Sequence, residues 1–337
     1  MAKLQKEFGK FHEEIKLKKF DENQDLREKR DLLFQDLRDG LKNEKIPGTT
    51  KKLIFREINQ GSYKMNTGIK PQNKDYDIDI GAVFNITNDE YNSAELKKLV
   101  RDTLNKGNRT VVYNRPCLTV EYKTEEYHVD LAVYSENNDD IHIAWGKEFS
   151  SKKIWYKSEP EELTTWVSDV STVDDESAQF RRSVRYLKKW KEKHFSASGN
   201  NAPPSIGLTI QARKAFSSYA AYDNNYDLTA LIRVVTYIKQ EFSSKYDSDS
   251  EVWKESISVA LPVQPYKNVY YKMSLTQQDN FYNKICDLLE LLEDVDAEES
   301  DYEASKLLQK IFGTDFPLAD DTRASEKAPY VTTGQNA

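Results

Sequence analysis

Apolar residues recur four or seven positions apart near the start of the chain: Leu26, Leu33, Leu37 and Leu41. A helix that buries one face shows this repeat, so residues 1–45 are predicted to contain a long amphipathic helix. Pro47-Gly48 follows and predicts its end.

The hundred residues that follow favour strands. Short apolar runs bounded by turn residues predict strands over 76–86, 110–113, 118–122, 127–134 and 141–145. Residues 53–58 are predicted as a short strand or one helical turn. Residues 95–104 carry helical spacing, and Gly107 closes that helix.

Helical spacing returns in the second half, over 176–195, 205–219, 228–242, 276–292 and 302–312. The pattern therefore predicts an α+β protein in three parts. Residues 1–170 form a strand-rich core with the long N-terminal helix, and residues 171–318 form a helical lobe. Residues 319–337 are polar and are predicted to be a flexible C-terminal tail.

Composition and charge limit the partners and the cellular compartment that can be expected. The formal net charge is -7, whereas a general nucleic-acid binder is usually basic, so long DNA or RNA is not the expected partner. The two cysteines, Cys117 and Cys286, form no metal or disulfide pattern, which fits a reducing cytoplasm. No run approaches the roughly 20 apolar residues of a membrane span, so a cytoplasmic protein without membrane contact is expected.

The chemistry centres on Gln60-Gly61-Ser62-Tyr63-Lys64 and the following Asp75-Tyr76-Asp77-Ile78-Asp79-Ile80-Gly81. In a strand, residues i and i+2 point to one face, so Asp77 and Asp79 project together. Divalent cations relieve the repulsion between such carboxylates. A Gly-Ser turn offers N–H groups and a hydroxyl to phosphate oxygens. The two features together suggest chemistry on a nucleoside triphosphate.

A third acid, Asp130, stands alone between apolar neighbours in a predicted strand. Asp77 and Asp79 alone are equally consistent with a solvated edge strand, and an isolated Asp130 with a structural role. Aspartate disfavours strand interiors, so three together favour a two-metal site for Mg²⁺, with Mn²⁺ as a substitute. Asp77 and Asp79 are expected to bind both ions and Asp130 the ion nearest the acceptor hydroxyl. Asp75 shares their register but lies at the loop edge.

These motifs resemble those of DNA polymerase β-like nucleotidyltransferases. Residues 61–69 with Asp77-Ile78-Asp79 are similar to the cGAS/DncV-like nucleotidyltransferases, bacterial enzymes that make cyclic oligonucleotide second messengers. Residues 184–191 resemble that family's helix with a triphosphate-binding lysine, and residues 262–269 and 310–317 resemble its C-terminal helical region. The resemblance covers about residues 5–318.

The resemblance implies a polymerase β-like core, a mixed sheet with helices, packed on the helical lobe around a central active-site cleft. It implies catalytic and metal-binding roles for the three acids, Asp77, Asp79 and Asp130. Four residues would bind the triphosphate: Gly61, Ser62, Lys188 and Ser205. Lys189 would take the place of Lys188 if the match to the family's helix is shifted by one residue. Ser205 is equally consistent with the N-cap of the following helix, and the two roles are compatible.

The function implied is a Mg²⁺-dependent condensation of ATP or other nucleoside triphosphates into a cyclic oligonucleotide for anti-phage (CBASS) signalling. A separately encoded effector would respond to the product. Two alternatives stay open: a terminal nucleotidyltransferase acting on RNA or a small hydroxyl acceptor, and a non-catalytic nucleotide-binding regulator. Residues 333–337 would suit conjugation by a ubiquitin-like apparatus, or they are an ordinary flexible end.

Overall fold

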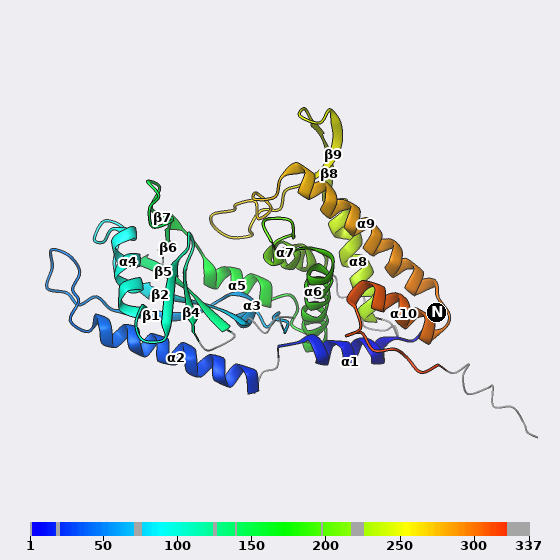
Figure 1. The fold of residues 1–337 in the computed structure, drawn as a ribbon, viewed down its shortest axis with the longest axis horizontal. Helices are drawn as coiled ribbons and strands as arrows, with labels where there is room; N and C mark the ends of the chain where they lie inside the picture. The colour runs from blue at the N-terminus through cyan, green and yellow to red at the C-terminus, as the bar shows by residue number, and fades with distance from the viewer. Residues whose placement is uncertain are drawn as a thin grey trace, which may run out of the picture.

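The structure is a computed structural model that describes residues 2–17, 21–70, 76–123, 127–138, 140–196, 198–216 and 226–321. A sheet-containing part and a helical part lie side by side and give an elongated molecule (Figure 1). The predicted α+β class, with a mixed sheet packed on a helical lobe, is confirmed.

In the part of the chain that the structure describes, the sheet has seven strands in the order β1-β2-β5-β4-β3, and β6 and β7 extend it from β5. Within the described residues, β2 and β5 pair in parallel, while their other neighbours are antiparallel. The strands are β1 (Phe55–Asn59), β2 (Tyr76–Phe84), β3 (Arg109–Tyr113), β4 (Leu118–Tyr122), β5 (Tyr127–Asn137), β6 (Asp140–Trp145) and β7 (Ile154–Lys157).

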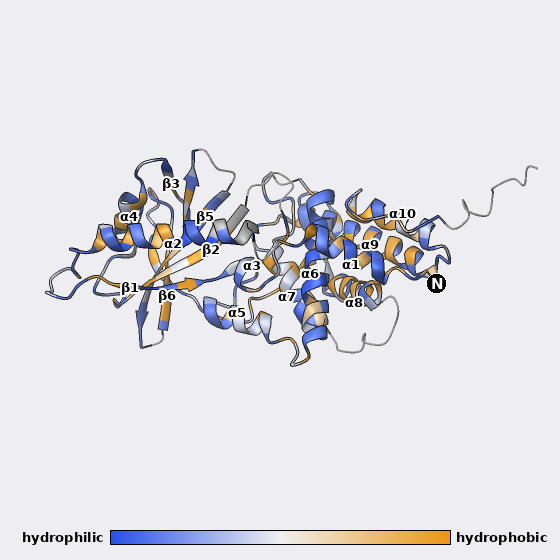
Figure 2. Ribbon diagram, turned by 90° about the horizontal axis from the view of Figure 1, so that it is seen from below, coloured by the Kyte–Doolittle hydropathy of each residue, from blue (hydrophilic) through white to orange (hydrophobic). Residues whose placement is uncertain are grey.

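Helices α2 (Asp21–Leu41) and α4 (Ser93–Leu104) cover one face of this sheet. Leu33, Leu37 and Leu41 of the predicted amphipathic helix are buried there against alternate residues of β2, among them Ile78 and Ile80. Each such side chain stabilises the fold by roughly 1.5–3 kcal/mol when fully buried. In Figure 2 the hydrophobic colour lies on strands of the sheet and also on helices of the helical part such as α8, while α2 is largely hydrophilic.

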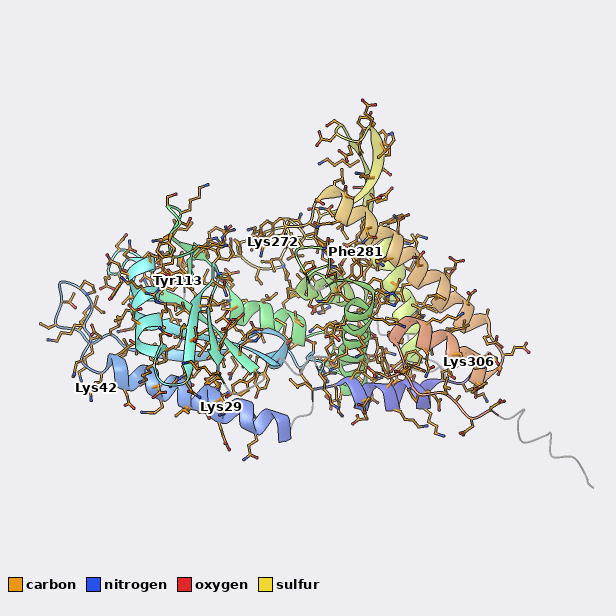
Figure 3. The ribbon with its side chains drawn as sticks, viewed as in Figure 1. Lys29, Lys42, Tyr113, Lys272, Phe281 and Lys306 are labelled. Carbon is orange, nitrogen blue, oxygen red and sulfur yellow. The ribbon has the colours of Figure 1, made fainter. Side chains whose placement is uncertain are left out.

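The helical part has a second core. Its helices are α5 (Pro160–Ser168), α6 (Asp174–His194), α7 (Ser205–Ala215), α8 (Tyr226–Gln240), α9 (Leu275–Ala297) and α10 (Asp301–Phe312). A hairpin of β8 (Phe242–Asp247) and β9 (Val252–Ile257) protrudes from it (Figure 1). Phe281 lies inside this core, whereas Tyr113 packs against the core of the sheet (Figure 3).

The N-terminal helix α1 (Gln5–Ile15) packs with the helical part and not with the sheet. Phe11 stacks on the ring of Tyr186 in α6, Phe8 contacts the same ring at a tilt, and both also contact Phe316. Val167 of α5 joins the same core. The domain boundary at residue 170 stays a prediction, because α1 and α5 precede it yet contribute to the helical core.

The predicted strands and most helices are confirmed within a few residues, and 53–58 is strand β1. Helix α5 and the β8–β9 hairpin were not predicted. Residues 217–219, predicted as helical, and the tail residues 322–337 lie outside the described residues. None of the helices in the described part of the chain has the length and apolar run that a bilayer crossing requires.

Candidate active site

The Gly-Ser turn sits directly on Asp79. Gly61 opens the short helix α3 (Gly61–Lys64) with φ +66°, a left-handed conformation that glycine adopts without strain. A Cβ atom at position 61 would lie 1.8 Å from Oδ2 of Asp79. The backbone N–H of Gln60 also donates to the Asp79 carbonyl at 3.1 Å. The Gly-Ser turn and Asp79 therefore form one unit.

Asp79 and Asp130 are paired in register on the parallel strands β2 and β5. Their neighbours Ile78 and Val129 are buried on the opposite face, so both carboxylates project to the same side. Asp77 belongs to β2 as well, but its side chain lies outside the described part of the structure, as does all of Asp75. Among the side chains that the structure describes, no three His, Cys, Asp or Glu form a metal-binding group.

The carboxylate of Asp130 is held from the side of β4. The Thr119 hydroxyl donates to its Oδ1 at 2.5 Å, and the side-chain amide of Asn114 donates to that hydroxyl at 2.8 Å. A threonine hydroxyl has one hydrogen, so Thr119 accepts from Asn114 and donates to Asp130. Burial, reinforced by the charge of Asp130, raises the pKa of Cys117 to about 12, so this nearby thiol stays neutral.

A cavity of about 560 Å³ lies between the sheet part and the helical part. This volume suits a small-molecule site. Its polar wall carries Gln60, Gly61, Ser62 and Asp79 from one part and Lys188, Lys191 and Ser205 from the other. Apolar residues complete it, among them Leu163, Ile206, Leu261 and Val263.

Gln60 is fixed at the cavity wall by two hydrogen bonds. Its side-chain oxygen accepts from the Tyr134 hydroxyl at 2.8 Å, and its side-chain nitrogen donates to the Ile80 carbonyl at 3.3 Å. Burial raises the pKa of Tyr134 well above its usual value, so the phenol stays protonated and remains a donor. This arrangement holds the start of the Gly-Ser turn on the sheet.

Cationic side chains of α6 form the opposite wall. The Lys188 ammonium donates to the carbonyl of Thr67 at 2.8 Å and to its hydroxyl at 3.3 Å. Burial, together with the charges of Lys191 and Arg185, lowers the pKa of Lys188 to about 7. One turn on, Lys191 donates to the Ser205 hydroxyl at 2.6 Å, and burial lowers its pKa too.

A protein-family model for the nucleotidyltransferase domain of "Cyclic GMP-AMP synthase DncV-like" proteins matches residues 56–134. This segment runs from β1 into β5 and contains the Gly-Ser turn and all three acids. The matched segment is thus a nucleotidyltransferase domain of the cGAS/DncV-like kind. The sequence-based recognition of this family is therefore confirmed.

Individual relatives agree with this family. A cyclic GMP-AMP synthase of Escherichia albertii is 28% identical over 182 residues, which are 51% of this chain and 40% of that relative. This chain therefore matches about 40% of that relative's length. The Vibrio cholerae DncV cyclic AMP-GMP synthase superimposes with a TM-score of 0.71 at 17% identity, over 92% of this chain and 97% of that one. Its apo form gives 0.72 at 18% identity, over 92% and 96%, and these likenesses show a shared fold.

Five of the residues predicted for the site line one cavity: Gly61, Ser62, Asp79, Lys188 and Ser205. Asp130 adjoins Asp79 but is not among the residues lining the cavity. The alternative Lys189 does not line it either, because its ammonium binds Asp315 at 2.6 Å. Pro204 is the N-cap of α7, without a side-chain cap bond, so Ser205 is not the N-cap.

Sequence reasoning missed Lys191 and the anchored Gln60 as wall residues. Lys191 carried a usable signal, because it follows Lys188 by three positions and therefore lies near the same helix face. Gln60 carried no such signal apart from its position directly before Gly61. Its role depends on Tyr134, which is 74 positions away.

Proposed function

We propose that this chain is a nucleotidyltransferase that condenses nucleoside triphosphates into a cyclic oligonucleotide. The observation that carries the proposal is the pairing of Asp79 with Asp130 beside the Gly61-Ser62 turn, opposite Lys191 and Ser205. Asp79, the Gly-Ser turn and Lys191 line one cavity and Asp130 adjoins Asp79, an arrangement that suits transfer of a phosphoryl group. The family of the chain supports the same activity.

The donor set fits Mg²⁺. Asp79 and Asp130 present hard oxygen ligands on one side of the sheet, and Asp77 would add the third carboxylate. We propose that the three hold two ions, for which Mn²⁺ can substitute. When bound, the ions would lower the pKa of the attacking hydroxyl and neutralise the triphosphate. Thr119 would orient Asp130 by occupying its Oδ1.

The substrates follow from the walls of the cavity. Ser62 and the Gly61 backbone would contact the triphosphate from the sheet side, and Lys191 and Ser205 from the helical side. The apolar residues Leu163, Ile206 and Val263 would enclose a base. Structures of Vibrio cholerae DncV with ATP and GTP make these two nucleotides the first substrates to test.

The reaction would join two nucleotides. A ribose hydroxyl of one attacks the α-phosphorus of the other, a new P–O bond forms, and the bond to the β-phosphate breaks with release of pyrophosphate. A second such transfer closes the ring. The residues of this chain hold the acceptor hydroxyl beside Asp130 and keep the triphosphate in line with it.

The biological role would be signalling in the cytoplasm. We infer that the cyclic product activates a separately encoded effector in anti-phage (CBASS) defence. Conjugation through the C-terminal carboxylate is a further proposal. The residues that it concerns, 333–337, lie outside the described residues.

The test is incubation of the purified protein with ATP, GTP, CTP and UTP and Mg²⁺ or Mn²⁺, followed by phosphatase treatment, chromatography and mass spectrometry. Phosphatase-resistant products that Asp79→Asn and Asp130→Asn fail to make are expected. Linear or acceptor-attached products would instead indicate a terminal nucleotidyltransferase. Nucleotide binding without metal-dependent turnover would indicate a regulator.

A further inference from the structure

Two cations of α6 bind three consecutive carbonyl groups of the segment after the Gly-Ser turn. Arg185 donates to the Asn66 carbonyl at 2.6 Å and to the Gly68 carbonyl at 3.0 Å. Lys188, one turn further, donates to the carbonyl between them, that of Thr67, at 2.8 Å. Residues 66–68 thus present their carbonyl groups to one face of α6.

Both cations are buried. The exposed fraction is 5% for Arg185 and 6% for Lys188. A buried charge is costly unless fixed partners bind it, so the carbonyl groups of residues 66–68 offset that cost. Burial and Arg185 lower the pKa of His12 to about 4. The His12 ring is therefore neutral at pH 7, and its Nε2, 3.2 Å from Nη1 of Arg185, can accept from the guanidinium.

The same segment is bonded back to the Gly-Ser turn. The Thr67 N–H donates to the Ser62 carbonyl at 2.9 Å, and the Met65 N–H donates to the Gly61 carbonyl at 3.1 Å. On its other side, the Leu17 N–H donates to the Gly68 carbonyl at 3.3 Å. Residues 66–68 therefore connect the turn on the sheet to α6 and the end of α1 in the helical part.

Arg185, Lys188 and Lys191 follow each other at intervals of three along α6. We propose that Arg185 and Lys188 are positioning residues that hold Ser62 at a set place opposite Lys191 and Ser205, and that Lys188 acts through Thr67 and not by contact with phosphate. This inference rests on the proposed function for its effect on catalysis. The anchor itself, defined as the hydrogen bonds from Arg185 and Lys188 to the carbonyl groups of residues 66–68, does not rest on it.

The first test is amide hydrogen exchange of residues 62–70 without nucleotide. Lys188→Met should raise exchange in this segment about tenfold, because the Thr67 carbonyl loses a charged donor. Lys191→Met is the matched control: it makes the same substitution one turn away and should leave exchange in this segment unchanged. Arg185→Lys keeps the charge, but one ammonium cannot bridge two carbonyl groups two residues apart, so exchange should again rise.

The second test separates positioning from direct contact by binding of ATP, ADP and AMP. Lys188→Met should weaken all three by a similar factor, about tenfold, because the whole turn is displaced. Lys191→Met should weaken ATP far more than AMP. Unchanged exchange in Lys188→Met, together with a loss confined to ATP, would overturn the proposal and make Lys188 a phosphate ligand.

Failure of the anchor can be distinguished from failure of the proposed function. Protection of residues 62–70 that depends on Lys188, in a protein that makes no product, would retain the anchor and reject the proposed function. Wild-type protection in both Lys188→Met and Arg185→Lys would reject the anchor whatever the activity. If Lys188→Met does not fold by circular dichroism, the milder Arg185→Lys decides the question alone.

Discussion

Gly61 lies so close to the carboxylate of Asp79 that a Cβ atom at position 61 would be 1.8 Å from Oδ2. The Gly-Ser turn and the carboxylate of Asp79 are thus in direct backbone-to-side-chain contact. Any side chain at position 61 must displace one or the other.

Gly61→Ala should therefore abolish most activity, by about a hundredfold or more, because it moves Asp79 or Ser62 and strains a left-handed backbone. Gly48→Ala is the control. Gly48 has a similar φ of +72°, and a Cβ there would meet nothing within 4 Å. Both variants should lose about 1 kcal/mol or more of stability in thermal melts, but only Gly61→Ala should stop product formation. Equal activity of the two would contradict the contact.

Thr119→Val should weaken metal use without unfolding the protein. The substitution keeps the shape of the side chain but removes the donor to Asp130 Oδ1. We expect about a tenfold rise in the Mg²⁺ concentration needed for half-maximal turnover. Thr110→Val on the exposed part of β3 is the matched control. A Mg²⁺ titration that shows no difference between the two variants would mean that the hydroxyl does not orient Asp130.

Lys188 should give the protein a measurable pH dependence. Its pKa falls from its ordinary 10.5 to about 7, so the unfolded chain binds more protons than the folded chain between these values. The free energy of unfolding should therefore rise with pH across this window, by up to roughly 1.4 kcal/mol per pH unit from this group. Denaturant titrations of wild type and Lys188→Met should show that slope reduced in the variant. Identical slopes would mean that Lys188 is not desolvated.

Lys189 and Lys191 should differ sharply although they are two positions apart. Lys189 binds the half-exposed Asp315, so Lys189→Met should cost about 1 kcal/mol or less and leave nucleotide binding intact. Lys191→Met should weaken ATP binding at least about tenfold. Calorimetric titration measures the affinity of both variants for ATP. A larger loss of affinity in Lys189→Met than in Lys191→Met would place the cavity on another face of α6.

Asp77→Asn should remove activity, and Asp75→Asn should leave most of it. Asp77 lies two residues before Asp79 in β2, and strand alternation predicts that the two side chains share a face. Product formation under identical Mg²⁺ measures both variants. Greater loss in Asp75→Asn would shift the acid motif by two residues.

The acid pair shows what local pattern can predict. Alternation along 76–84 and 127–134 predicted two strands and the face that each aspartate occupies, because strand periodicity depends only on near neighbours. That Asp79 and Asp130 are paired in register follows from the parallel pairing of β2 with β5, which no short-range pattern specifies.

By itself, the sequence determined the fold class, and it predicted the three acids, the Gly-Ser turn and the resemblance to the cGAS/DncV-like nucleotidyltransferases. Only the tertiary structure decided what each cation of α6 does. Residues 188, 189 and 191 are all lysines, yet their partners are Thr67, Asp315 and Ser205. The reason is physical. Helical spacing sets the direction of each side chain about the helix axis. The partner of that side chain depends on packing between distant segments, and 121 positions separate Lys188 from Thr67.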